Sequence, residues 1–198
     1  MVSNRIQIRK AHESDSIIIA QLHIENIKAG FLTSLGKKLL TGIYSIIITG
    51  KESFCFVAES NGKIVAFLSA TQDCNQLYRR FFRKNFFWGL KIIIMKVVNW
   101  QVLKKTVDHL FLPRRKVKLP ASEFLTIAVD RSVKRLGVGT QLFRIMQKEF
   151  RKRKIEGFIA IVGQSLVPSN KFMHKMKGTK ISEFEVHKGE KSNVYFWD

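Results

Sequence analysis

The chain has 198 residues, 45% of them hydrophobic and 25% charged, which is ordinary for a soluble globular protein and long enough for one domain with a buried core. Its two cysteines, without a CxxC spacing or a Cys/His cluster, exclude a disulfide framework and a structural zinc site. The 35 lysines and arginines far exceed the 15 aspartates and glutamates, and the resulting net charge of +20 favours an anionic partner: a nucleotide-bearing cofactor, an acidic acceptor, nucleic acid or a membrane surface.

The sequence shows no targeting or membrane-spanning segment. The first ten residues alternate polar and apolar side chains and lack a hydrophobic signal core. No apolar run approaches the roughly 18 residues of a spanning helix. The thiols of Cys55 and Cys74 are expected to be reduced, as is usual inside cells. We therefore expect a cytoplasmic protein that is neither secreted nor integral to a membrane.

Hydrophobic periodicity predicts helices and strands through the first seventy residues. Ser14 and Asp15 offer caps for the first helix, and Gly30 is suited to end it. The dipeptide Asn61-Gly62 tolerates positive φ and predicts a tight hairpin turn. The predicted strands are 5–10, 54–59 and 63–69, and the predicted helices are 14–30 and 37–50.

Residues 77–118 differ in character from the rest of the chain. They include twelve basic residues, eight aromatic residues and a single acid, Asp108. The pattern predicts one or two amphipathic helices closed by Pro113 and Pro120. Such a segment is suited to bind an anionic substrate or to lie against lipid headgroups. The alternative is a helical excursion that packs its apolar face on the core and leaves its lysines in solvent.

The second half of the chain is also predicted to alternate strands and helices. Residues 122–129 are predicted as a buried central strand, followed by a turn and a helix that opens at Gly137. Later predicted elements are a strand at 157–162, a short helix at 170–176 and strands at 180–186 and 192–197. Together the elements predict one mixed α/β domain.

The turn Lys134-Arg-Leu-Gly-Val-Gly-Thr140 has the character of an anion cradle. Gly137 and Gly139 let the backbone approach a ligand closely, and the N–H groups at a helix start favour phosphate. A dinucleotide fingerprint would want a third glycine or alanine where Leu142 stands, and a Walker loop would need Gly-Lys-Ser/Thr, which is absent. Both of these nucleotide-binding interpretations are therefore excluded.

Residues 123–142 resemble the cofactor motif of the GNAT acetyltransferase superfamily, a strand followed by Arg/Gln-x-x-Gly-x-Gly/Ala at the start of a helix. Gly137 and Gly139 match this motif. Lys134 stands where the family usually has Arg or Gln, so it keeps the positive charge without the planar guanidinium. The order of predicted elements over residues 6–197 also resembles the family.

The resemblance implies one acyltransferase domain over residues 1–198, with a mixed central sheet flanked by helices and a basic helical insertion at 77–118. It also implies acetyl-CoA as co-substrate and no metal. The implied cofactor contacts come from the strand backbone along the pantetheine arm, from turn amides on the pyrophosphate and from an asparagine near the pantetheine. These residues are Ile127, Ala128, Val129, Lys134, Arg135, Leu136, Gly137, Val138, Gly139, Thr140 and Asn170.

Acetyl transfer to an amine needs a neutral amine, a stabilised oxyanion and a proton for the departing thiolate. The resemblance implies Glu123 as the base, although a strand-end carboxylate can equally serve to pair with a cation. The family tyrosine that protonates the thiolate is absent, because Met173 or His174 takes its place, depending on register. His174 is therefore one candidate acid, and Tyr195 in the last strand is another.

These features predict an N-acetyltransferase that uses acetyl-CoA and a primary amine acceptor, with an anionic acceptor such as a nucleotide-linked amino sugar, a protein or a peptide. His23 and Glu25 are candidates to face the acceptor, and the alternative for His23 is a packed or surface side chain. A different class remains open: a catalytically weak module of the same fold that binds nucleic acid or an anionic membrane through residues 77–118. An enzyme that works at a membrane surface is a third possibility.

Overall fold

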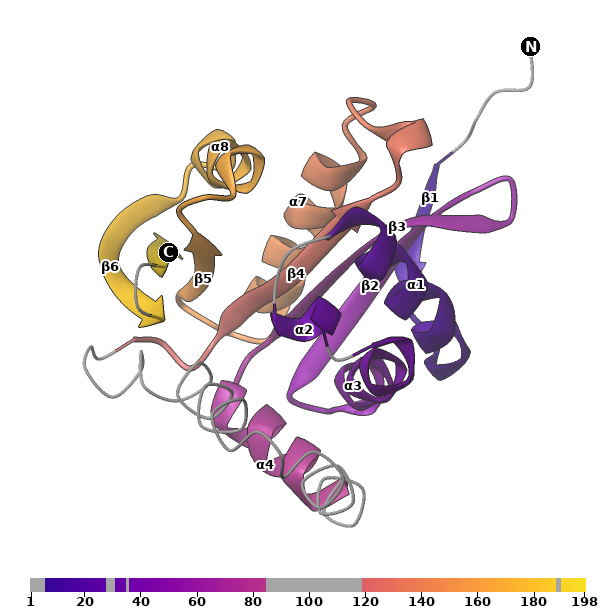
Figure 1. Cartoon of the computed structure of the whole chain (residues 1–198), viewed down its shortest axis with the longest axis horizontal. Coiled ribbons are helices and arrows are strands. Elements are labelled where there is room, and N and C mark those ends of the chain that lie inside the picture. The colour runs from indigo at the N-terminus through magenta and orange to yellow at the C-terminus, as the bar shows by residue number, and fades with distance from the viewer. Residues whose placement is uncertain (1–5, 28–30, 35, 85–118, 188–189) are drawn as a thin grey trace.

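The computed structural model describes residues 6–27, 31–34, 36–84, 119–187 and 190–198 (Figure 1). Within these ranges seven strands form one mixed sheet in the order β1-β2-β3-β4-β5-β7-β6, with helices on both faces, which confirms the predicted fold class. The strands are β1 (Gln7–Lys10), β2 (Ser53–Ser60), β3 (Lys63–Thr71), β4 (Glu123–Val129), β5 (Phe158–Gly163), β6 (Thr179–His187) and β7 (Glu190–Trp197). The α-helices are α1 (Ser16–Asn26), α2 (Phe31–Ser34), α3 (Lys37–Thr49), α4 (Cys74–Lys84), α7 (Val138–Lys152) and α8 (Val167–Lys175).

The ends of two helices differ from the prediction for local reasons. The first helix, α1, ends at Asn26, well before Gly30. The short helix α8 starts at Val167 and not at 170, because a proline such as Pro168 is tolerated in the first turn of a helix. The four-residue α2 is too short to give a periodic signal in the sequence, and it was not predicted.

The basic segment 77–118 begins inside α4, which starts ahead of it at Cys74. Leu77 and Phe81 of this helix pack against the core between the sheet and α1 and α3. To this extent the segment behaves as a helix that packs its apolar face on the domain. Residues 85–118 lie outside the described residues, so the helices predicted there stay a prediction.

The sheet separates two apolar cores. One face packs on α7 and α8, and the other packs on α1 and α3, as the layers in Figure 1 show. Phe143 of α7, which is 1% exposed, lies at the centre of the first core. Its ring contacts Phe124 of β4, Phe158 of β5 and Trp197 of β7, with centroid distances of 5.7, 6.2 and 5.4 Å. A single aromatic ring therefore joins strands from both halves of the sheet.

The parallel neighbours β4 and β5 pair at one position only, Glu123 with Ile159. Towards its other edge β4 pairs with β3 along its whole length, with Leu125 as an extra residue in a β-bulge. Beyond Glu123 the edge of β4 that faces β5 is therefore open. The strand is central, as predicted, but most of its residues are half-buried and not buried, because no neighbouring strand covers this edge.

A buried polar chain crosses the second core behind β4. The Tyr44 hydroxyl lies 2.6 Å from His23 Nδ1 and is also hydrogen-bonded to the side chain of Thr126, next to the bulge. His23 Nε2 is buried and has no hydrogen-bond partner among the described residues. Burial lowers the pKa of His23 to about 4, so the imidazole is neutral at pH 7.

This buried histidine predicts a loss of stability in acid. In the unfolded chain His23 takes up a proton below its ordinary pKa of 6.5, whereas in the folded chain it does so only near pH 4. The free energy of unfolding therefore falls as the pH drops through this window. Between pH 7 and pH 5 the free energy of unfolding of the natural protein should fall by about 2 kcal/mol more than that of His23→Gln. Urea unfolding at both pH values measures the difference, and parallel losses in the two proteins would contradict it.

The start of α7 depends on one glycine conformation. Gly137 has φ +78°, in the left-handed region, and directly precedes the helix, as the sequence predicts. A Cβ at Gly137 would meet nothing within 4 Å, so an alanine there suffers conformational strain and no clash. A Cβ at Gly139 would lie in ordinary contact, 3.6 Å from Ile127 and Val129.

The two glycines should therefore respond differently to alanine. Gly137→Ala should lower the free energy of unfolding by about 1–2 kcal/mol, because an L-residue is strained in the left-handed region. Gly139→Ala lies inside the helix and should leave stability unchanged or raise it by up to about 1 kcal/mol. Urea unfolding of both variants checks this, and an equal loss in the two would refute the assignment of strain to Gly137.

Candidate active site

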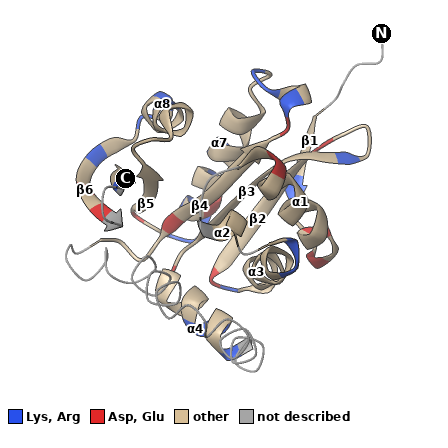
Figure 2. Cartoon of the chain, in the orientation of Figure 1, with Lys and Arg blue, Asp and Glu red and all other residues tan. Residues whose placement is uncertain are grey.

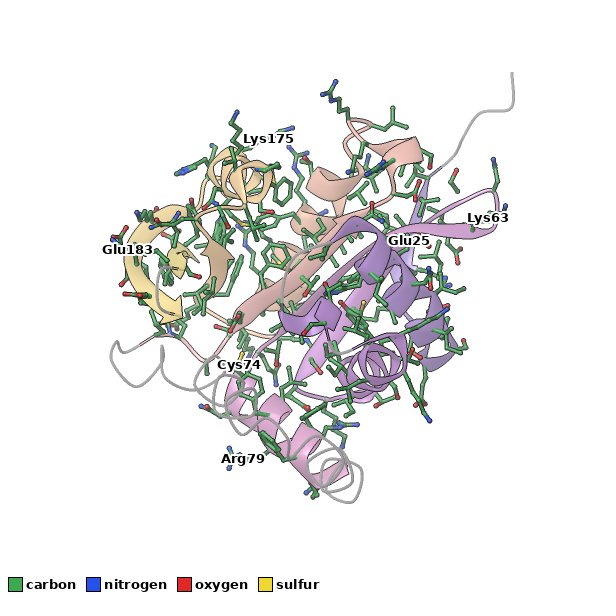
Figure 3. The ribbon with its side chains drawn as sticks, viewed as in Figure 1. Glu25, Lys63, Cys74, Arg79, Lys175 and Glu183 are labelled. Atoms are coloured by element: carbon green, nitrogen blue, oxygen red, sulfur yellow. The ribbon has the colours of Figure 1, made fainter. Side chains whose placement is uncertain are left out.

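A pocket of about 470 Å³ lies where β4 and β5 diverge. Its lining residues come from the end of α1, from β4, from the turn and first residues of α7, and from α8. Figure 3 shows one of them, Lys175, on α8. Three stretches that are far apart in the sequence, 26–27, 127–140 and 168–175, thus meet around one cavity.

The first amides of α7 face this pocket without partners inside the helix. The first hydrogen bond of α7 runs from Gln141 N to Gly137 O at 3.0 Å. The N–H groups of Val138, Gly139 and Thr140 precede it and have no intrahelical acceptor. All three residues line the pocket. The partial positive charge of the helix N-terminus adds to them, so this end of the pocket is suited to phosphate.

Basic side chains surround the same end. Lys134 and Arg135 from the turn and Lys175 from α8 line the pocket, and Figure 2 shows basic residues on this turn and on α8. Asp130, the acid at the start of the turn, accepts hydrogen bonds from the backbone N–H (2.8 Å) and the hydroxyl (2.6 Å) of Ser132. These bonds, with the nearby cations, lower the pKa of Asp130, so its charge is held within the turn.

The open edge of β4 forms another wall. Asp130 N donates to Val65 O at 2.8 Å across the β3–β4 pair. Because successive residues of a strand point their backbone groups to opposite edges, those of Ala128 face β3, and those of Ile127 and Val129 face the edge that β5 has left. Ile127, Ala128 and Val129 all line the pocket. An extended ligand with amide groups can pair with such an edge.

Nine of the eleven cofactor residues predicted from the sequence line the pocket. Leu136 instead points into solvent, with 58% of its surface exposed. Asn170 also lies outside the lining, because its side-chain amide is engaged in packing α8 on the sheet. Its Nδ2 donates to Gly163 O, and its Oδ1 accepts from Asn193 Nδ2 and Tyr195 Oη, each at 2.9 Å.

Glu123 lies at the start of β4, about 13 Å along the strand from Ile127. It is half-buried, and it lies outside the residues that line the pocket. Its Oε2 accepts a hydrogen bond from Cys74 Sγ at 3.1 Å. The carboxylate is therefore placed at the opposite end of the open strand edge from the helix amides.

His174 and Tyr195, the two candidate acids, contact each other. Tyr195 Oη donates to Asn170 and lies 3.2 Å from His174 Nε2, so the histidine N–H donates to the tyrosine oxygen. Tyr195 is 1% exposed, His174 is exposed, and neither lines the pocket. Met173 does line it, so of the two alternatives for the missing tyrosine, Met173 faces the cavity.

The sequence reasoning placed the α8 helix near the cofactor through Asn170 and Met173, but it missed other residues of the lining. Asn26 and Ile27 at the end of α1, and Ser169 and Phe172 on α8, line the pocket. Ser169, Phe172 and Met173 follow the i, i+3, i+4 spacing of one helix face, which was a usable signal. Of the two α1 candidates, His23 is buried, and Glu25 is exposed and accepts a hydrogen bond from Gln21.

Across the described ranges, no three His, Cys, Asp or Glu side chains are grouped so that they could hold a metal ion. Cys55 and Cys74 are both buried free thiols. No helix within the part of the chain that the structure describes is long and apolar enough to cross a membrane.

Solved structures share this fold over nearly the whole chain. An N-acetyltransferase from Staphylococcus aureus Mu50 is 15% identical with a TM-score of 0.62, covering 98% of each chain. Ard1 from Thermoplasma volcanium is 11% identical, with a TM-score of 0.61 over 97% of this chain and 96% of that one. The ribosomal-protein-S18-alanine N-acetyltransferase from Escherichia coli is 12% identical, with a TM-score of 0.60 over 97% and 92%. At such identities the likeness shows the fold alone.

A comparison of the sequence with protein families identifies the chain more directly. No curated protein matches it significantly. The profile of the acetyltransferase (GNAT) family matches residues 38–178, which is 141 of the 198 residues and includes β4, the glycine turn and α8. The chain therefore belongs to the GNAT family of acetyltransferases, which are acyl-transferring enzymes.

Proposed function

We propose that this protein is an N-acetyltransferase that moves the acetyl group of acetyl-CoA to a primary amine. The observation that carries the proposal is the meeting, in one pocket, of helix N-terminal amides, basic side chains and an open strand edge. The first two suit the phosphates of coenzyme A, and the third suits the amides of its pantetheine arm. Within β4, the backbone groups of Ile127 and Val129 are the ones that would pair with that arm.

An arm held in this way runs along β4 from α7 towards Glu123 and brings the thioester closer to the carboxylate. The amine nitrogen attacks the thioester carbonyl, so a C–N bond forms, the C–S bond breaks and coenzyme A leaves as the thiolate. Glu123 would accept the proton that the amine loses, directly or through a water molecule. The transfer is direct and needs no covalent intermediate on the protein.

The departing thiolate also needs a proton. Met173, which faces the pocket, has no proton to donate. His174 and Tyr195 share a hydrogen bond outside the residues that line the pocket, and His174 is exposed to solvent. We therefore retain this pair as the proton source, acting on the thiolate through water. Asn170 supports the pair by accepting the tyrosine O–H.

The acceptor is proposed to be anionic, because a net charge of +20 exceeds what the phosphates of one coenzyme A require. An amino sugar carried on a nucleotide combines a primary amine with phosphate, and it is our first choice. A protein or peptide amine is the second. Two buried free thiols agree with a cytoplasmic location, which is part of the proposal.

Cofactor binding can be tested by adding bulk to the pocket. In Gly139→Trp the indole would extend from the Cβ position that contacts Ile127, Val129 and Phe172, and it should abolish acetyl-CoA binding measured by calorimetry. Gly42→Trp is the matched control, because a Cβ at Gly42 on α3 meets nothing within 4 Å and should leave binding intact. The titration is repeated at two salt concentrations. Binding that survives Gly139→Trp and merely follows salt would refute the proposed site.

The base can be tested separately from the cofactor site. Glu123→Gln should lower turnover by about 10²- to 10⁴-fold, because an amide cannot accept the amine proton. Acetyl-CoA affinity should stay unchanged, because Glu123 lies outside the pocket lining. Release of coenzyme A thiol with a panel of primary amines, amino sugars first, measures turnover. Glu183→Gln on β6 is the control carboxylate, and equal turnover in both variants would remove Glu123 from the mechanism.

A further inference from the structure

Cys74 and Glu123 meet outside the pocket, at the point where β4 is still paired on both edges. Cys74 is the first residue of α4 and is 0% exposed, and its thiol donates to Glu123 Oε2 at 3.1 Å. Glu123 lies opposite Thr71 of β3 and opposite Ile159 of β5. Figure 3 labels Cys74 at the start of α4. The thiol and the carboxylate come from residues 49 apart in the sequence.

The backbone fixes both partners in place. Cys74 N donates to Ala121 O at 2.8 Å, which ties the start of α4 to the residues just before β4. The Thr71 hydroxyl accepts from Asp73 N at 3.2 Å and donates to Glu52 O at 2.9 Å, so the turn between β3 and α4 is held as well. The S–H to carboxylate contact therefore follows from the path of the chain and does not depend on one surface rotamer.

The described neighbours of Cys74 and Glu123 differ in charge. Asp73, next to Cys74, turns its carboxylate towards α4, where it accepts from Asn75 N (2.8 Å) and Gln76 N (3.0 Å). The N-terminus of α4 adds a partial positive charge beside Cys74. The elements paired with β4 at Glu123 contribute Thr71 and Ile159, which carry no charge.

We propose that Cys74 is a positioning residue for Glu123: its S–H group holds the carboxylate in the orientation in which it accepts the proton of the acceptor amine. The assignment rests on the proposed role of Glu123 as base. A thiol is a weak hydrogen-bond donor, and a carboxylate oxygen accepts more than one hydrogen bond, so the contact orients Glu123 without blocking it as a proton acceptor. No bond to sulfur forms or breaks.

The chain provides its own control for this proposal. Cys55 in β2 is the second buried thiol, 3% exposed, and burial raises its pKa. Its thiol makes a long contact, to the carbonyl of Phe56 at 3.9 Å. Cys55→Ala therefore removes a buried thiol of the same kind without touching Glu123.

The test reads the two groups directly in the protein alone. The S–H stretching band of Cys74 absorbs in an infrared region clear of other protein groups, and it is assigned by its loss in Cys74→Ala. The carboxyl ¹³C signal of Glu123 is assigned by its loss in Glu123→Gln, and its chemical shift at one fixed neutral pH reports the hydrogen bond. Circular dichroism checks that each variant is folded. Cys74→Ser replaces the thiol with a small hydroxyl that can still donate, so it remains informative if the alanine variant does not fold.

We expect the Cys74 S–H band to shift in Glu123→Gln, because its acceptor is replaced. The carboxyl ¹³C signal of Glu123 should move in Cys74→Ala, return towards its original position in Cys74→Ser and stay unchanged in Cys55→Ala. An S–H band that is the same in Glu123→Gln, or identical Glu123 signals in all variants, would overturn the proposal. So would an acetyl group found on Cys74 after incubation with acetyl-CoA. Because no acetyl-CoA or amine enters the spectra, their failure is distinct from a failure of acetyl-CoA binding or turnover.

Discussion

The site depends on the divergence of β4 from β5. Buried backbone N–H and C=O groups need partners, and a central strand normally finds them on both edges. Here the backbone groups on one edge of β4 lose their partners beyond Glu123, where the pairing with β5 stops. The bulge at Leu125 lies just past this point, and a bulge bends a strand and disrupts its ladder. The result is a pocket whose wall is a row of polar backbone groups, open to an extended ligand.

A sheet that opens in the middle must be held together by something other than its ladder. In this protein Phe143 connects the separated strands. Its ring contacts residues of β4, β5 and β7, and it also contacts Phe172 of α8. On the opposite face, Thr126, Tyr44 and His23 connect the bulge to α3 and α1. The strand that carries the open edge is thus fixed from both faces.

The groups that suit the phosphates and the carboxylate proposed as the base lie at opposite ends of β4. The helix amides and cations lie at the end near Val129, and the Glu123 carboxylate lies at the other end. Acetyl-CoA has the same polarity, with phosphates at one end and a thioester at the other. Met173 lines the pocket, whereas the candidate acids His174 and Tyr195 lie outside the lining.

The sequence by itself determined the local features: the Asn61-Gly62 turn, the helix start after the left-handed Gly137 and the amides that follow it, because each depends on sterics within a few residues. The sequence also indicated the family, since the spacing of Gly137 and Gly139 after a strand is a local pattern. Only the tertiary structure decided that Asn170 is engaged in packing, that His174 meets Tyr195 and that Cys74 donates to Glu123. Those contacts depend on how each helix is rotated on the sheet and on which face a strand residue takes after a bulge. Long-range packing sets both, and a pattern of neighbours along the chain does not contain them.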